Sequence, residues 1–279
     1  MTQSPTLWEI FRYYAQRATI FPLEAVLETL HLRLGPLNPP RRVDPNGGGD
    51  FLGIGREFCK YFIELGDLRP EHSVLDVGSG CGRMAVPLLD YLTSGTYDGI
   101  EIMKKSVTWC RRAITPRHPN FRFHHADILN REYNPSGRLR AEDYRFPFPD
   151  PRFDFIFLTS VFTHMLPPSV ENYLREIARV LKPGGRCLIT WFLLDETSRK
   201  LSTTEKSQLN FKFDFGNYRS THKRIPEYAV AYDQDFAVGL YNRCSLVPRL
   251  PPYYGCWSGR ERKVSFQDII VATREEQRQ

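Results

Sequence analysis

Three glycines at alternate positions follow a short apolar segment near residue 75, and this run limits the possible folds more than any other part of the chain. The segment Val74–Val77 is typical of a strand, and Gly78, Gly80 and Gly82 come directly after it. Glycine lets a backbone adopt positive φ and approach a bound molecule closely, so such a run at a strand-to-helix turn is typical of sites for nucleotide-type ligands. We therefore predict an α/β sheet that binds such a ligand at this turn.

The spacing of these glycines narrows the choice of ligand. A dinucleotide fingerprint needs its third glycine three positions after the second, where this sequence has Arg83. Asp76, inside the motif, would repel a pyrophosphate. The loop therefore favours a cationic or neutral ligand.

Acidic residues lie at the ends of the next two expected strands. The expected strand at 97–101 ends in Glu101, and Asp127 follows a short strand at 121–124. Open parallel sheets bind ligands along their carboxyl edge, so this joint placement favours ligand contacts over ordinary solvated acids. Strands at 153–158 and 186–193 are expected next, and Lys182–Gly185 predicts a helix stop with a tight turn between them.

The four motifs together resemble the class I S-adenosylmethionine-dependent methyltransferases over about residues 51 to 273. The resemblance implies a Rossmann-like α/β fold: a seven-stranded, mostly parallel sheet with an antiparallel last strand and helices on both faces. It also implies S-adenosyl-L-methionine as the cofactor and S-adenosyl-L-homocysteine as the product. In this family Glu101 would hold the ribose hydroxyls, and Asp127 would meet the adenine amino group. The expected cofactor residues are Asp76, Gly78, Ser79, Gly80, Arg83, Glu101, Ile102, Asp127, Ile128 and Thr159.

The chain divides into an N-terminal helical segment with a linker, residues 1–50, and a methyltransferase domain, residues 51–274. Apolar spacing within 7–34 predicts two amphipathic helices, which could form a lid, a homodimer contact or a membrane-surface anchor. Phe51–Gly55 either covers the cofactor or simply begins a helix that runs from 55 to 65. An insertion at 195–232 follows the fifth strand, and a helix at 233–243 with strands at 245–253 and 265–274 completes the sheet.

Composition indicates an ordinary globular enzyme with a small-molecule partner. The net charge of +6 is spread along the chain rather than gathered in one run, which makes a nucleic-acid partner unlikely. Six cysteines show no Cys-x-x-Cys pair and no metal-ligand spacing with histidines, so we expect reduced thiols in a cytoplasmic protein. No apolar stretch reaches the roughly 18 residues of a membrane span, and no signal peptide is visible.

His164 is the first candidate for a catalytic base. The segment 159–165 leaves the fourth strand at the edge where the reactive methyl group should point, and methylation of a hydroxyl requires a group that takes its proton. The alternative is a histidine that only packs or caps the adjoining helix. His222 and Tyr232, near the insertion, are the next candidates.

Two sequence patterns are absent, and their absence limits the types of reaction that we expect. The Asn/Asp-Pro-Pro-Tyr/Phe run of amino-group methyltransferases is missing after the fourth strand, where Leu158–Val161 stands instead. No carboxylate cluster follows this strand that could bind a hard cation, so we expect no metal.

The predicted function is O-methylation of a small-molecule metabolite in a biosynthetic reaction, by in-line transfer with a histidine base. Alternatives are N- or C-methylation, methylation of a glycan hydroxyl, and a cyclisation or rearrangement that uses the cofactor without methyl transfer. A non-enzymatic partner subunit is a further alternative, although the intact motif argues against it. Aromatic residues of the insertion and final hairpin either line the acceptor pocket or form core: Phe211, Phe213, Phe215, Tyr253, Tyr254 and Trp257.

Overall fold

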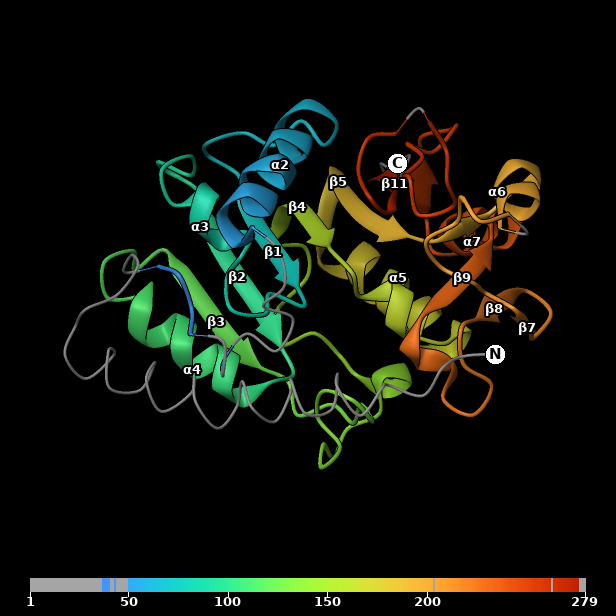
Figure 1. Ribbon diagram of the computed structural model, residues 1–279. Coiled ribbons are helices and arrows are strands. Elements are labelled where there is room, and N and C mark those ends of the chain that lie inside the picture. Colours follow the sequence, from blue (N-terminus) through green and yellow to red (C-terminus); the bar gives the residue numbers. More distant parts are fainter. Residues whose placement is uncertain (1–36, 41–42, 44–49, 203, 262, 276–279) are drawn as a thin grey trace.

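A computed structural model describes residues 37–40, 43, 50–202, 204–261 and 263–275 (Figure 1). The two helices expected within residues 7–34 lie outside the described residues, as does most of the expected linker.

The fold is built on a seven-stranded sheet. Its order is β10-β11-β5-β4-β1-β2-β3. The bounds are β1 Ser73–Val77, β2 Thr96–Glu101, β3 Phe121–His125, β4 Phe153–Leu158, β5 Leu181–Trp191, β10 Leu246–Pro248 and β11 Asp268–Arg274. Strands β1 to β5 pair in parallel, whereas β11 runs antiparallel to both β5 and β10. This confirms the predicted Rossmann-like sheet, and the order reverses between β1 and β4, where such sheets open a ligand crevice.

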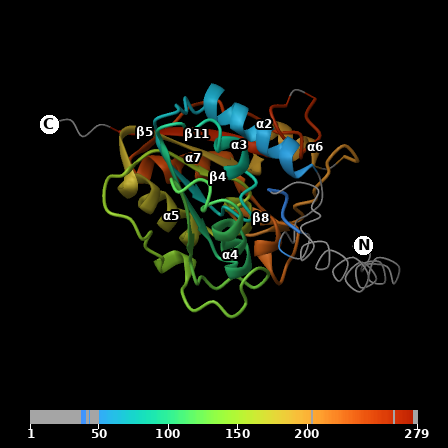
Figure 2. The same ribbon diagram turned by 90° about the vertical axis from the view of Figure 1, so that its left-hand side faces the viewer.

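Helices cover both faces of the sheet (Figure 1, Figure 2). On one face lie α2 (Phe51–Glu64), α3 (Ala85–Leu88) and α4 (Lys104–Ala113), which bury aromatic and aliphatic side chains against β-strand residues such as Phe155. On the other face lie α5 (Pro167–Val180) and α7 (Gln234–Arg243), packed on residues such as Ile156. Successive strand residues point to opposite faces, so the run of apolar residues in each strand feeds both cores.

Helix α2 begins at Phe51, four residues before the predicted start. The Asp50 side chain accepts a hydrogen bond from the Gly53 N–H at 2.8 Å, which satisfies one of the unpaired amides of the first turn. Phe51–Gly55 is therefore a helix entry, one of the two alternatives predicted from the sequence.

Strand β5 begins directly after α5, at Leu181 rather than at Arg186. Leu181 pairs with Phe153, and the register then shifts so that Arg186 pairs with Phe155. Lys182–Gly185 thus forms an irregularity within the strand instead of the predicted turn before it. The strand leaves the main sheet at Trp191, two residues earlier than expected.

The insertion at 195–232 contributes to a second, four-stranded sheet, which the sequence did not predict (Figure 1). Its order is β6-β9-β8-β7, with β6 Leu193–Leu194, β7 Phe213–Asp214, β8 Tyr218–Ser220 and β9 Val230–Asp233. The short helix α6 (Glu196–Leu201) follows β6. Three 3-10 turns complete the described elements: η1 (Ala141–Asp143), η2 (Phe162–His164) and η3 (Pro226–Tyr228).

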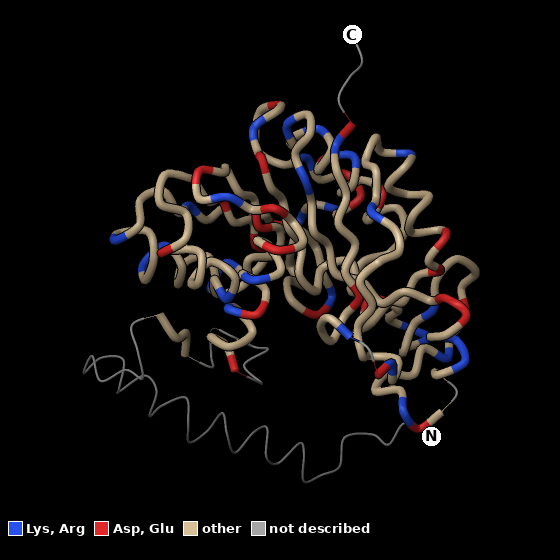
Figure 3. Tube along the Cα trace, turned by 90° about the horizontal axis from the view of Figure 1, so that it is seen from above, with Lys and Arg blue, Asp and Glu red and all other residues tan. Residues whose placement is uncertain are grey.

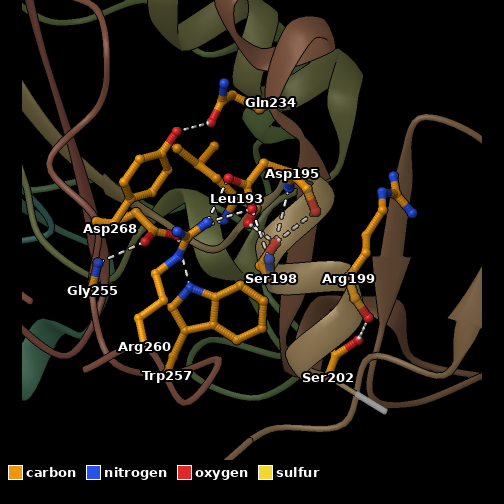
Figure 4. Close-up of polar contacts among 11 residues, drawn as sticks. Leu193, Asp195, Ser198, Arg199, Ser202, Gln234, Gly255, Trp257, Arg260 and Asp268 are labelled. Carbon is orange, nitrogen blue, oxygen red and sulfur yellow. Dashed lines mark hydrogen bonds and ion pairs between the residues drawn. The ribbon is translucent and has the colours of Figure 1, made fainter. Parts of the chain in front are cut away.

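A buried polar cluster fastens the final hairpin to the start of this insertion (Figure 4). Asp195 caps α6 through the Ser198 N–H and forms an ion pair with Arg260. Asp268 on β11 is almost fully buried, which raises the pKa of its carboxyl to about 6. It accepts three N–H groups at 2.7 Å, those of Leu193, Gly255 and Trp257. Because these donors come from both segments, the cluster fixes the second sheet relative to the first.

Charged residues of both signs are interspersed over the described trace (Figure 3). No described helix is long and apolar enough to cross a membrane.

Candidate active site

A cavity of about 660 Å³ opens at the carboxyl edge of β1 to β4. One end is lined by residues that follow β1, β2 and β3, and the other by the segment after β4, the start of α5, η1 and one residue of η3. This is the edge at which the sequence placed the ligand.

The glycine loop adopts the predicted backbone conformation. Gly78 and Gly80 have φ of 87° and 52°. A Cβ on Gly78 would stand 2.4 Å from Val161 Cγ2, whereas one on Gly80 would meet no atom within 4 Å and would project into open space. Gly78 is therefore required for the close approach of two loops, and Gly80 leaves room beside the cavity.

Glu101 lies on the cavity wall and is almost fully buried. Its Oε2 accepts a hydrogen bond from the Gly80 N–H at 2.8 Å, and its Oε1 accepts one from the Met103 N–H at 2.7 Å. Burial raises the pKa of this carboxyl, and the backbone N–H groups oppose that shift. Each oxygen keeps a second lone pair, so the carboxylate can still accept hydroxyl groups from a ligand.

Asp76 is fully buried below the loop and is absent from the cavity wall. Its Oδ2 accepts a hydrogen bond from the Tyr97 hydroxyl at 2.5 Å. Burial raises the pKa of Asp76 to about 8, with the Tyr97 bond opposing the shift and the charge of Glu101 adding to it. The Oδ1 atom of Asp76 is buried without a hydrogen-bond partner among the described residues, so the one side-chain bond of Asp76 ties β1 to β2.

Three other predicted cofactor residues also lie off the wall. Ser79 packs so closely on Gly99 that a Cβ at Gly99 would strike the Ser79 side chain. The Arg83 guanidinium lies over the Phe51 ring. The Asp127 carboxylate is bound by Arg138, at 2.6 Å from Nε. Of the predicted set, the cavity brings together Gly78, Gly80, Glu101, Ile102, Ile128, Thr159 and His164.

His164 ends η2, the turn after β4, and lies on the cavity wall. Its Nδ1 lies 3.1 Å from the Glu227 carbonyl oxygen. Because a carbonyl can only accept, Nδ1 must carry the proton, and Nε2 is then the basic nitrogen. Burial lowers the pKa of His164, so the ring is neutral at pH 7, although the Glu227 carbonyl partly opposes the shift.

The other catalytic candidates, His222 and Tyr232, do not line the cavity. His222 lies off the cavity wall, where its Nδ1 accepts the Ile225 N–H at 3.0 Å and shapes the loop before η3. Tyr232 is fully buried, and its hydroxyl donates to the Met165 carbonyl at 2.7 Å. This bond ties β9 of the insertion to the segment that carries His164.

For the aromatic residues of the insertion and hairpin, the sequence left two alternatives open: lining of the acceptor pocket, or core. None of the six lies on the cavity wall. Phe211 and Trp257 instead pack against Phe192 in a separate small core, because the second sheet needs an apolar interior of its own.

Several wall residues escaped sequence analysis, among them Met103, Tyr133, Tyr173 and Glu227. Met103 follows the acid that ends β2 and could have been found from that position. Glu227 stands in the insertion 63 residues beyond His164, and no sequence signal pairs the two.

Ser160 lies on the same wall and has a φ of 57°, which is uncommon for a residue other than glycine. Its N–H donates to Thr190 Oγ1 at 2.8 Å, and its hydroxyl donates to Gln267 Oε1 at 3.1 Å. These two bonds hold the strained turn after β4 against β5 and the segment before β11.

Residues 75–189 match a family model described as a methyltransferase domain. The chain contains a class I S-adenosylmethionine-dependent methyltransferase domain. The matched residues include the glycine loop, Glu101 and His164, and the match ends before the insertion.

Curated relatives resemble the methyltransferase domain over part of their length. A fatty-acid O-methyltransferase of Mycolicibacterium smegmatis is 32% identical over 117 residues, 42% of this chain and 36% of that protein. The 27-O-demethylrifamycin SV methyltransferase of Amycolatopsis mediterranei is 32% identical over 130 residues, 46% of this chain and 41% of that protein. The chain therefore spans less than half the length of these two relatives.

Among solved structures, the PH0226 protein of Pyrococcus horikoshii has a TM-score of 0.55 at 14% identity. The likeness covers 82% of this chain and 93% of that one. At this identity the match supports the methyltransferase fold alone.

Proposed function

We propose that this protein transfers the methyl group of S-adenosylmethionine to a hydroxyl of a small-molecule metabolite, with His164 as the base and without a metal. Relatives whose names specify an O-methyltransferase and a 27-O-demethylrifamycin SV methyltransferase support the acceptor class. We also propose a cytoplasmic location, for which cysteines that form no disulfide among the described residues are typical.

The residues at the first end of the cavity fit an adenosyl ligand. Gly80 leaves open space beside the wall, and the Glu101 carboxylate has lone pairs left for ribose hydroxyls. Ile102 and Ile128 provide apolar surface on the same wall for a flat ring. When bound, the cofactor supplies a methyl group activated by its sulfonium.

The observation that carries the proposal is the fixed tautomer of His164. The Glu227 carbonyl holds the proton on Nδ1, and burial keeps the ring neutral, so Nε2 is ready to accept a proton. The imidazole takes the hydroxyl proton as the acceptor oxygen gains the methyl carbon, and a positioned base of this kind contributes about 10²- to 10⁴-fold in rate. The cavity walls position the acceptor, which supplies much of the remaining rate.

The direct test is incubation with methyl-labelled cofactor and a metabolite extract of the source cells. Label in a product shows transfer, whereas conversion without label shows that the fold has been reused for another reaction. Retained activity after dialysis against EDTA supports a reaction without a metal. Activity that is lost and then restored by a divalent cation would contradict it.

The role of His164 is tested by His164→Asn, because the Asn amide can still donate to the Glu227 carbonyl but lacks a basic nitrogen. We expect kcat to fall about 10²- to 10⁴-fold with the cofactor Kd unchanged. His222→Asn is the matched control, since its amide oxygen can still accept the Ile225 N–H away from the cavity. Full activity in His164→Asn would show that this histidine is not the base and only packs against its neighbours.

A further inference from the structure

The Oε2 atom of the Glu227 carboxylate is buried and has no hydrogen-bond partner among the described residues. This atom is shielded from solvent, yet Glu227 lies on the wall of the cavity. The backbone of the same residue holds His164 through its carbonyl. The residue that holds the proposed base through its backbone therefore also carries a carboxylate oxygen without a hydrogen-bond partner among the described residues.

A buried acceptor atom without a donor lowers the stability of the folded protein when no ligand is bound. A buried acceptor without a donor costs about 1 to 3 kcal/mol, and a charged one costs more. The phenol of Tyr218 is close enough for the Glu227 charge to help raise its pKa, after burial, but it donates no hydrogen bond to Glu227. The cavity is the direction from which a donor can come, and rotation about the terminal side-chain torsion can present either oxygen to it.

We propose that Glu227 binds a second hydrogen-bond donor of the acceptor, next to the hydroxyl that His164 deprotonates. One residue supplies both the carbonyl that holds the imidazole and the carboxylate, so the two donors must lie close together in the acceptor. A vicinal diol, as in a sugar or cyclitol ring, has this arrangement. The inference rests on the proposed function and specifies its substrate class.

Periodate cleavage tests this class directly. Periodate oxidises the carbons of a vicinal diol, breaks the bond between them and is itself reduced to iodate, whereas it leaves an isolated hydroxyl intact. A metabolite extract is treated with periodate, quenched with excess glycol, and then incubated with the protein and labelled cofactor. The control extract receives periodate that was quenched beforehand.

We expect labelled product from the control extract and at least a tenfold loss of label from the oxidised one. Undiminished labelling of the oxidised extract would overturn the diol inference and leave the proposed function standing. Absence of label in both extracts would instead overturn the proposed function, and this inference with it.

The role of the residue is tested with Glu227→Gln on the labelled acceptor at pH 8, where His164 is neutral. We expect kcat/KM for the acceptor to fall at least tenfold while the KM for the cofactor stays within twofold. Glu132→Gln is the control, because Glu132 is close enough to influence the His164 pKa but does not line the cavity. An unchanged kcat/KM for the acceptor in Glu227→Gln would overturn the assignment.

Discussion

Tyr232→Phe tests whether the insertion positions the base. The change removes one hydroxyl from a fully buried side chain and leaves the ring in place. That hydroxyl donates to the Met165 carbonyl, one residue after His164. Without it, the segment after β4 loses a direct hydrogen bond to the second sheet.

The structure sets the expected magnitude. One buried hydrogen bond contributes about 0.5 to 1.5 kcal/mol, and a carbonyl left without a donor adds desolvation, so the free energy of unfolding should fall by about 1 to 2 kcal/mol. Urea denaturation followed by circular dichroism measures this change as a lower midpoint at an unchanged m-value. Because His164 is less firmly held, kcat should fall severalfold with the cofactor Kd unchanged.

Tyr241→Phe provides the matched control. Tyr241 is also fully buried, and its hydroxyl accepts one hydrogen bond, from Trp191 Nε1 at 2.9 Å. It has no hydrogen bond to the segment that carries His164. We expect a similar loss of stability with kcat unchanged. Equal kcat losses in the two variants would refute the positioning role and indicate a general effect of destabilisation.

The remaining predictions concern the cofactor and the base. Glu101→Gln places an amide N–H₂ group against one of the two backbone N–H donors of Glu101. Calorimetry should therefore show that the cofactor binds more weakly by about 1 to 3 kcal/mol. An unchanged Kd would show that Glu101 does not contact the cofactor. Since burial lowers the pKa of His164 below 6.5 and the base must be neutral, kcat/KM should be flat above pH 6.5 and fall in more acidic solution. A profile that instead rises toward acid would exclude a neutral imidazole. Gly78→Ala should weaken cofactor binding because its Cβ would strike Val161, and unaltered binding would contradict this contact.

The cofactor end of the cavity was largely predictable from sequence because it depends on local signals. Gly78 and Gly80 follow β1, and Glu101 ends β2, so strand periodicity and turn chemistry together place them at one edge. Asp76 and Asp127, by contrast, do not lie on the cavity wall. Whether an acid at such a position faces the cavity depends on a partner from elsewhere, here Tyr97 for the first and Arg138 for the second.

The acceptor end could not be predicted in this way. Its polar groups come from the segment after β4, which includes η2, and from η1, α5 and η3. The insertion has no periodic pattern strong enough to predict a second sheet. A segment rich in aromatic residues can either line a pocket or form a core, and its composition does not distinguish the two roles. Packing against Phe192 assigns Phe211 to a core, whereas Phe215 is exposed.

The sequence alone therefore determined the α/β class, the strand that leads into the glycine loop and the acid that ends the following strand, because each rests on residues close together in the chain. Tertiary structure decided which nitrogen of His164 is basic and where Glu227 lies. Both depend on a contact that spans 63 residues, and only chain folding can bring such residues together.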